Sequence, residues 1–156
     1  MRTKGVILKN IDEFEKVSSC KKPFLCCGTS FQKTKAFEYL RSNFDLVVFD
    51  HIRPNPRFED MLDAAVLFKK ENCDFIIGAG GGSPLDSAKM IKLLVTNDPK
   101  TALTEPMQDN DIGFFAIPTT SGTGSEATKY SVFYVNENVK HSLSNDAFLP
   151  DFVLLD

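Results

Sequence analysis

Short apolar runs alternate along this chain with longer amphipathic stretches, and this alternation limits the possible folds more than any other feature. The apolar runs are bounded by polar, Gly or Pro residues and occupy 24–28, 45–50, 74–80, 112–118 and 152–156. Helical spacing of apolar residues recurs between them, over about 31–42, 57–71 and 84–95. This order predicts an α/β fold, in which helices flank a parallel sheet through right-handed crossovers. Ligands of such sheets bind at the carboxyl ends of the strands.

One segment departs from this alternation. Residues 126–146 alternate apolar with polar side chains, and the sequence Asn-Glu-Asn at 136–138 interrupts them. Alternation with a period of two, broken by turn-forming residues, is typical of paired strands. We therefore expect a small antiparallel β-hairpin near 128–143 in place of a helix.

Length and charge exclude several classes of protein. The 156 residues, of which 42% are hydrophobic, suit one domain with a sizeable core. The net charge is −3 and no run of Lys or Arg exceeds a pair, which argues against a nucleic-acid partner. No stretch approaches the roughly 18 apolar residues that a membrane span needs. We expect a soluble, cytoplasmic protein with neither nucleic acid nor membrane as a partner.

The four cysteines follow no metal-binding or disulfide spacing. Cys26 and Cys27 lie within the apolar run at 24–28, where free thiols behave as small core side chains. We expect reduced, buried thiols, and a catalytic cysteine is the alternative interpretation.

The stretch GAGGGSPLDSAK at 78–89 joins an apolar run to a helical pattern. Ser83 suits the N-cap of that helix, Pro84 its first position, and Asp86 completes a capping box with Ser83. Free N–H groups and the positive end of the helix dipole would then face the glycines, which predicts an anion site. Asp86 would compete with a bound phosphate, so we expect it to accept from the Ser83 N–H, away from the ligand.

The glycine stretch matches known fingerprints only in part. It fits G-x-G-x-x-G with Ser83 at the third glycine, and it follows the third predicted strand instead of the first. It lacks the Gly-Lys-Ser/Thr ending of a P-loop. A glycine-rich turn without a ligand is the alternative.

A second loop rich in hydroxyl groups, TTSGTGSE at 119–126, follows the fourth predicted strand. Two such loops at the ends of parallel strands suit the phosphates and ribose of one nucleotide. We name Thr119, Thr120 and Thr123 as candidate ligands. The alternative is a solvated loop that leads into a helix.

In their order and spacing, four segments resemble the iron-containing alcohol dehydrogenase family. They are RPNPRFEDM (53–61), DFIIGAGGGSPLDSAKMI (74–91), AIPTTSGTGSEAT (116–128) and VKHSLSNDAFLPDFVLLD (139–156). The resemblance implies a Rossmann-like NAD(P)-binding domain over 1–156, followed in the family by a helical metal-binding domain that this chain lacks. It implies an oxidoreductase that transfers a hydride between NAD(P) and a small alcohol or aldehyde.

The resemblance also assigns cofactor-binding roles to individual residues. Gly81, Gly82 and Ser83 resemble the family's pyrophosphate binders, and Asn55 matches a position that approaches the cofactor. Lys140 resembles a lysine that reaches the nicotinamide ribose. Asp86 and Lys89 match motif positions whose role is mainly structural. The full set of candidate cofactor-binding residues is Gly28, Thr29, Ser30, Asn55, Gly81, Gly82, Ser83, Asp86, Thr119, Thr120, Thr123 and Lys140.

The family's catalytic divalent metal, Fe or Zn, has no evident ligand set here. The only histidines, His51 and His141, are far apart and show no H-x-x-x-H spacing. We therefore expect no catalytic residue in this chain, and expect it to be inactive alone but active as part of a full-length dehydrogenase. The alternatives are a non-catalytic nucleotide-binding or oligomerisation module, or a relative of glycerol dehydrogenase.

The cofactor preference is predicted from the end of the first apolar run. NAD-selective members of the family often carry an acidic residue there, whereas this chain has Gly28, Thr29 and Ser30, with Lys33 nearby. Without a carboxylate to repel it, a 2′-phosphate could fit, which favours NADP. We also expect a homo-oligomer.

Overall fold

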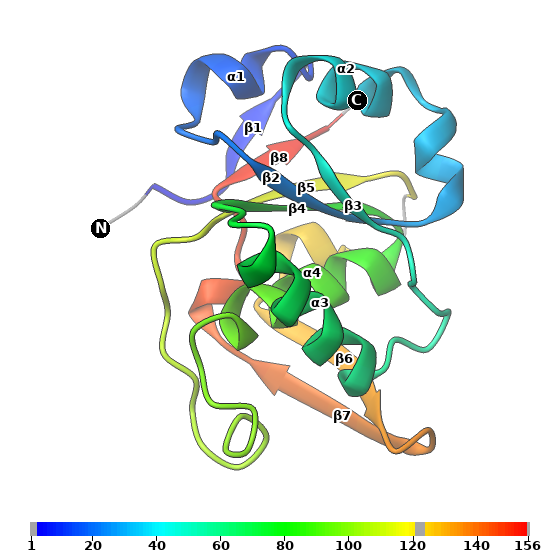
Figure 1. Cartoon of the computed structure of the whole chain (residues 1–156), viewed down its shortest axis with the longest axis vertical. Coiled ribbons are helices and arrows are strands. Elements are labelled where there is room, and N and C mark those ends of the chain that lie inside the picture. The colour runs from blue at the N-terminus through cyan, green and yellow to red at the C-terminus, as the bar shows by residue number, and fades with distance from the viewer. Residues whose placement is uncertain (1–2, 121–123, 156) are drawn as a thin grey trace.

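In a computed structural model, which describes residues 3–120 and 124–155, a six-stranded parallel sheet forms the middle layer (Figure 1). Its strand order is β1-β8-β5-β4-β2-β3. The strands are β1 (Val6–Leu8), β2 (Pro23–Cys27), β3 (Val47–Phe49), β4 (Phe75–Gly80), β5 (Gly113–Pro118) and β8 (Phe152–Leu154). The predicted parallel α/β sheet is confirmed, and β1 is an additional strand that the apolar runs did not reveal.

Both faces of the sheet are covered, which explains why its strands read as continuous apolar runs. Along β2, Phe24 and Cys26 point into one core cluster, while Leu25 and Cys27 point into the other. All five residues of β2 are buried. Alternate side chains therefore serve opposite cores, and none of them needs to be polar.

Helices form one layer on each side of the sheet (Figure 1). On one side, α1 (Glu13–Val17) and α2 (Lys35–Asn43) place Phe14 and Leu40 against the sheet. On the other side, α3 (Phe58–Lys70) and α4 (Gly82–Leu94) contribute Met61 and Ile91 to the larger cluster. The predicted helix over 31–42 is in fact a 3-10 turn, Thr29–Lys33, followed by α2. Thr34 separates the two because its hydroxyl accepts from the Phe37 N–H and caps α2.

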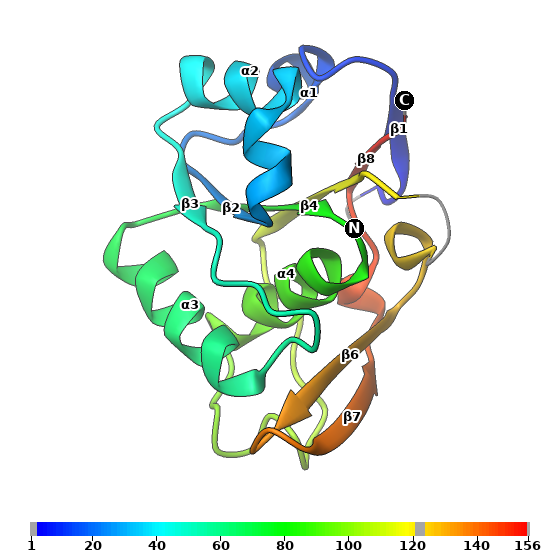
Figure 2. The same cartoon turned by 90° about the vertical axis from the view of Figure 1, so that its right-hand side faces the viewer.

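The predicted hairpin is confirmed as β6 (Tyr130–Val135) and β7 (Val139–Ser144), an antiparallel pair. Asn136 and Glu137 take positive φ angles of 52° and 73° in its turn. The hairpin lies beside α4 (Figure 2), and the Ser131 hydroxyl donates to the Asp86 carbonyl of that helix. Helix α4 is therefore enclosed between the sheet and the hairpin.

The cysteines are free thiols, as predicted. Cys26 and Cys27 are fully buried. Burial, with a smaller contribution from the charge of Asp50, raises the pKa of Cys27 to about 12. Burial likewise raises the pKa of Cys26, so neither thiol ionises readily.

Across the described ranges, no helix has the length and apolar character that crossing a membrane would require.

Candidate functional site

Three candidate segments meet at the carboxyl edge of the sheet. In the strand register Cys27 lies beside Ala79, and Gly80 lies beside Pro118. The chain therefore leaves β2, β4 and β5 at neighbouring points. This arrangement places Gly28, Gly81 and Thr119 along one edge, with the glycine turn in the middle.

Two glycines of β4, which lead into this turn, are required by packing within the protein. A Cβ on Gly78 would lie 2.8 Å from the Cβ of Ala88, because α4 crosses closely over β4. Gly80 has φ of +135°, and a Cβ there would lie 2.9 Å from the Pro84 Cγ. Gly81 differs, since a Cβ on it would only reach ordinary contact distance, 3.5 Å from the Thr120 Oγ1. Gly81 and Thr120 are thus adjacent, in the part of the turn that a ligand can approach.

Helix α4 begins at Gly82, two residues earlier than predicted. Gly81, with φ −83° and ψ −158°, is the N-cap, and Gly82 and Ser83 are already helical. The Ser83 hydroxyl does not cap the helix but donates to the Pro54 carbonyl at 2.7 Å. The predicted capping box is therefore wrong, because the extended glycine ends the strand and leaves Ser83 inside the first turn.

The predicted contact between Asp86 and the Ser83 N–H is also wrong. The Asp86 Oδ1 accepts from the Ser125 hydroxyl at 2.8 Å, and its Oδ2 accepts from the Val132 N–H at 3.2 Å. This carboxylate thus faces the hairpin side of α4. The first turn of α4 holds no acidic residue, so its N–H groups and positive dipole end meet no competing carboxylate from that turn.

Residues 54–56 connect the positions of Asn55 and Lys140 to the start of α4. Asn55 is exposed, next to Pro54, whose carbonyl binds Ser83. The Pro56 carbonyl accepts from the Tyr134 N–H at 2.8 Å, and Tyr134 is the register partner of Lys140 on β7. The structure therefore brings Asn55 close to the start of α4 and places Lys140, also exposed, on the hairpin beyond it.

The remaining candidates lie after β2 and β5. Thr29 and Ser30 are exposed in the 3-10 turn that follows Gly28. On the other side, Thr119 is fixed to the glycine turn by its N–H, which donates to the Gly80 carbonyl at 3.0 Å. Thr123 lies outside the described residues.

A hollow of about 610 Å³ lies beside Thr119 and Thr120 at the carboxyl edge. Its other walls include Phe31, Lys35, Glu126 and Leu154. Sequence patterns did not identify these four residues, because they come from four separate segments. What these four residues share is their place in the fold, since each lies near the carboxyl end of a strand or at the start of α2.

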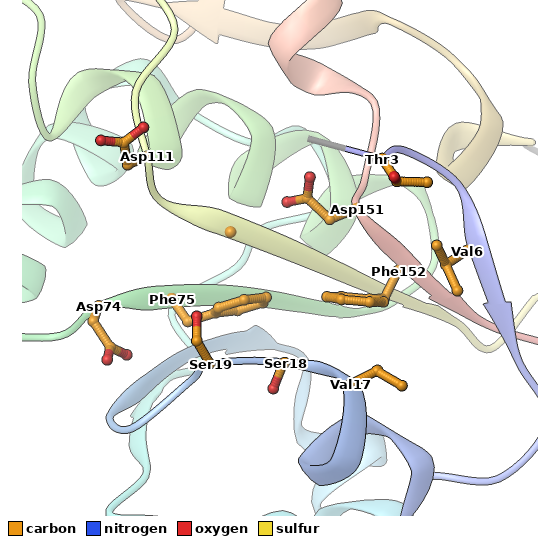
Figure 3. A pocket seen from close by; sticks show the side chains of 11 residues that line it. Thr3, Val6, Val17, Ser18, Ser19, Asp74, Phe75, Asp111, Asp151 and Phe152 are labelled. Carbon is orange, nitrogen blue, oxygen red and sulfur yellow. The ribbon is translucent and has the colours of Figure 1, made fainter. Parts of the chain in front are cut away.

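A second hollow, of about 600 Å³, lies at the opposite edge of the sheet (Figure 3). It contains the rings of Phe75 and Phe152, whose centroids are 6.4 Å apart. Asp74 and Asp151 border it, but their carboxylates accept from backbone N–H groups. They therefore hold the starts of strands together. Because open α/β sheets bind ligands at the carboxyl ends, and every described candidate lies away from this hollow, we place the site at the other edge.

Within residues 3–120 and 124–155, no group of three or more His, Cys, Asp or Glu side chains is arranged to hold a metal ion. His51 follows β3 and packs edge-on against Phe49, with ring centroids 5.7 Å apart. His141 lies on β7 and stacks on Phe133 at 5.8 Å. The described residues therefore do not fit the metal implied by the resemblance, and we assign no metal ligand to them.

Comparison with known proteins agrees with the resemblance. A profile of the iron-containing alcohol dehydrogenases matches residues 2–156. The chain is 37% identical over 106 residues to 1,3-propanediol dehydrogenase of Citrobacter freundii, covering 63% of this chain and 26% of that protein. It is 33% identical over 131 residues to NADPH-dependent butanol dehydrogenase of Clostridium saccharobutylicum, covering 78% and 34%.

Solved structures give the same answer for the fold. The crystal structure of a 1,3-propanediol oxidoreductase superposes with a TM-score of 0.81 at 28% identity. That match covers 99% of this chain but 44% of the other. The chain thus spans less than half the length of the relatives it matches. Since the family profile extends over almost all of it, the chain belongs to the iron-containing alcohol dehydrogenase family.

Proposed function

We propose that residues 1–156 form an NAD(P)-binding domain, the nucleotide-binding part of a metal-dependent alcohol dehydrogenase. In the whole enzyme, a hydride passes between NAD(P) and a small alcohol or aldehyde. One observation carries the proposal: the start of α4, with Gly81 as its N-cap, lies next to Thr120 at the carboxyl edge of a parallel sheet. A relative that shares the fold and whose name includes NADPH supports the nucleotide.

The cofactor pyrophosphate would lie against Gly81, Gly82 and Ser83. The N–H groups of the first turn have no partner within the helix, and the dipole of this 13-residue helix favours an anion at its start. Thr119 and Thr120 would add hydroxyl donors from the neighbouring strand end. The hollow beside them would receive another part of the nucleotide. The bound cofactor supplies the hydride chemistry, while these residues bind and orient it.

We further propose a preference for NADP over NAD. Gly28, Thr29 and Ser30 place no carboxylate at the end of β2, and Lys33 is exposed in the same turn. Asp50 follows β3, the strand beside β2, and its Oδ2 accepts from the Gln32 amide at 2.9 Å. A 2′-phosphate at the end of β2 would meet hydroxyl groups and the Lys33 cation, while the nearby Asp50 carboxylate is already bound to Gln32. The name of the butanol dehydrogenase relative favours the same cofactor.

Calorimetric titration of this chain with NADPH and NADH tests the proposal. Ser83→Asp places a carboxylate where the pyrophosphate would lie, and Gly81→Val fills the approach beside Thr120. Each should weaken NADPH binding about tenfold or more, equivalent to about 1.4 kcal/mol. Ser42→Asp, which adds the same charge on exposed α2, is the matched control and should leave binding unchanged. Equal heats for wild type and all three variants would refute the assignment.

We also propose that the chain forms a homo-oligomer. Strand β1 is an edge of the sheet, and its Ile7 side chain is 54% exposed. Leu155 is 44% exposed, and both residues border one largely apolar hollow. Exposed apolar surface on an edge strand favours association between copies.

A further inference from the structure

Helix α4 carries two lysines, Lys89 and Lys92, that are completely buried. Burying an ammonium group is costly unless hydrogen bonds and a counter-charge replace its water. The two lysines lie three residues apart, yet they contact different parts of the chain. Their separate partners indicate separate roles.

Among the described residues outside its own helix, the Lys89 ammonium donates to one short segment, residues 125–130. It donates to the Ser125 Oγ at 3.1 Å, the Thr128 Oγ1 at 3.2 Å and the Tyr130 carbonyl at 2.7 Å. An ammonium has three N–H groups, so these acceptors can use all of them. Asp86, one turn earlier, has its Oδ1 3.7 Å from the same nitrogen and supplies the counter-charge.

Ser125 is the point where this network reaches the candidate site. Its hydroxyl accepts from Lys89 and donates to the Asp86 Oδ1, so both functions of the hydroxyl are used. The next residue, Glu126, lines the 610 Å³ hollow together with Thr119 and Thr120. The lysine therefore fixes the chain immediately beside one wall of that hollow.

We infer that Lys89 is a positioning residue for nucleotide binding: its ammonium holds residues 125–130, and with them the Glu126 wall of the hollow, against α4. The link to nucleotide affinity rests on the proposed function. The placement of residues 125–130 does not depend on the proposed function, and it can be measured without any nucleotide.

Lys92 provides a matched control in the same helix. Its ammonium donates to the Asp109 Oδ1 at 2.7 Å and lies 3.3 Å from the Asn110 Oδ1. Asp109 and Asn110 precede β5, so this contact lies at the amino end of that strand, away from the glycine turn. Replacing either lysine by Met removes the same charge from an equally buried position.

The experiment compares Lys89→Met, Lys92→Met and Ser125→Ala with the wild-type chain. Amide hydrogen exchange over 125–130 is measured without nucleotide, the NADPH dissociation constant by calorimetry, and the urea midpoint by fluorescence or circular dichroism. We expect both Met variants to lower the midpoint. Of these two, Lys89→Met alone should speed exchange over 125–130 and weaken NADPH binding about tenfold. Ser125→Ala should act in the same direction with a smaller loss of stability.

Each result decides one part of the inference. Equal effects of Lys89→Met and Lys92→Met on NADPH binding would overturn the positioning role, because a general loss of stability would then explain both. Unchanged exchange over 125–130 in Lys89→Met would overturn it as well. If Lys89→Met does not fold, unchanged exchange and affinity in Ser125→Ala overturn it. If wild type binds neither NADPH nor NADH, the proposed function fails, and exchange alone decides the placement of the segment.

Discussion

Gly78, within β4, and Gly81, at the start of α4, lie three residues apart but have different surroundings. Gly78 is buried under α4, where a Cβ would lie 2.8 Å from Ala88 and 3.3 Å from a methyl group of Leu85. Gly81 has room for a Cβ on the side of Thr120. Glycine-rich sequence alone predicted an anion site here, but it could not separate glycines needed for packing from one that has room for a side chain. The two kinds of glycine can be told apart only from the structure, in which α4 crosses closely over Gly78 of β4.

Gly78→Ala should therefore destabilise the protein. The added methyl overlaps the Ala88 Cβ, and overpacking of this kind costs about 1–3 kcal/mol. Urea denaturation of the variant and wild type measures the difference in the free energy of unfolding. Gly28→Ala, where a Cβ meets no atom within 4 Å, is the control and should change stability by less than about 0.5 kcal/mol. A Gly78→Ala variant as stable as wild type would show that α4 can shift away from β4.

At the level of elements, the strongly patterned segments were predicted within a few residues. Strands β2, β4 and β5 and helices α3 and α4 match their apolar patterns because each one packs a long apolar surface into the core. Strand β1 and helix α1 were not predicted. Each is short, and in β1 only Leu8 is buried, so no periodic pattern exists to detect. The start of α4 was misplaced because Ser83 is a common N-cap residue, whereas a glycine took that position.

Helix α4 is also tied to the chain before β5, through Lys92 and Asp109, and this contact predicts a pH dependence. Burial raises the pKa of Asp109, but the hydrogen bonds from Lys92 and the Asn110 N–H, with the Lys92 charge, outweigh it and lower the pKa below 3.8. A carboxyl whose pKa is lowered on folding stabilises the protein above its unfolded value, and that contribution is lost as the pH falls through its folded value. The stabilisation that Asp109 contributes is therefore lost below about pH 3.8.

A carbon-detected NMR titration of the Asp109 carboxyl measures the pKa of Asp109 directly. Its midpoint should lie below 3.8 in wild type and move back upward in Lys92→Met, because the cation is gone. In Lys89→Met the midpoint should not move, since Lys89 contacts a different segment. A wild-type midpoint at or above 3.8 would contradict the ion pair.

For the whole molecule, the two edges of the sheet carry different surfaces. The carboxyl edge gathers most of the described candidate residues, with glycines, hydroxyl groups and the start of α4. The alternation of strand and helix patterns in the sequence is enough to predict that these segments share one edge of the sheet. The hollow beside Thr120 could not be predicted in this way, since its walls meet only after β8 has joined the sheet and α2 has packed against it.

Self-association of the whole molecule should depend on the surface around β1. Ile7 and Leu155 are both largely exposed and border a hollow formed with Leu149, Pro150 and Val153. Ile7→Lys places a charge within this apolar surface, so it should shift the chain toward the monomer in size-exclusion chromatography with light scattering. Val66→Lys is the matched control, since Val66 is 63% exposed on α3 and does not border this hollow. A wild-type monomer at high concentration, or an equal shift in both variants, would contradict an interface at β1. A shift confined to Ile7→Lys would mean that copies meet at this edge strand, next to Glu126 and Leu155, which also line the hollow at the carboxyl edge.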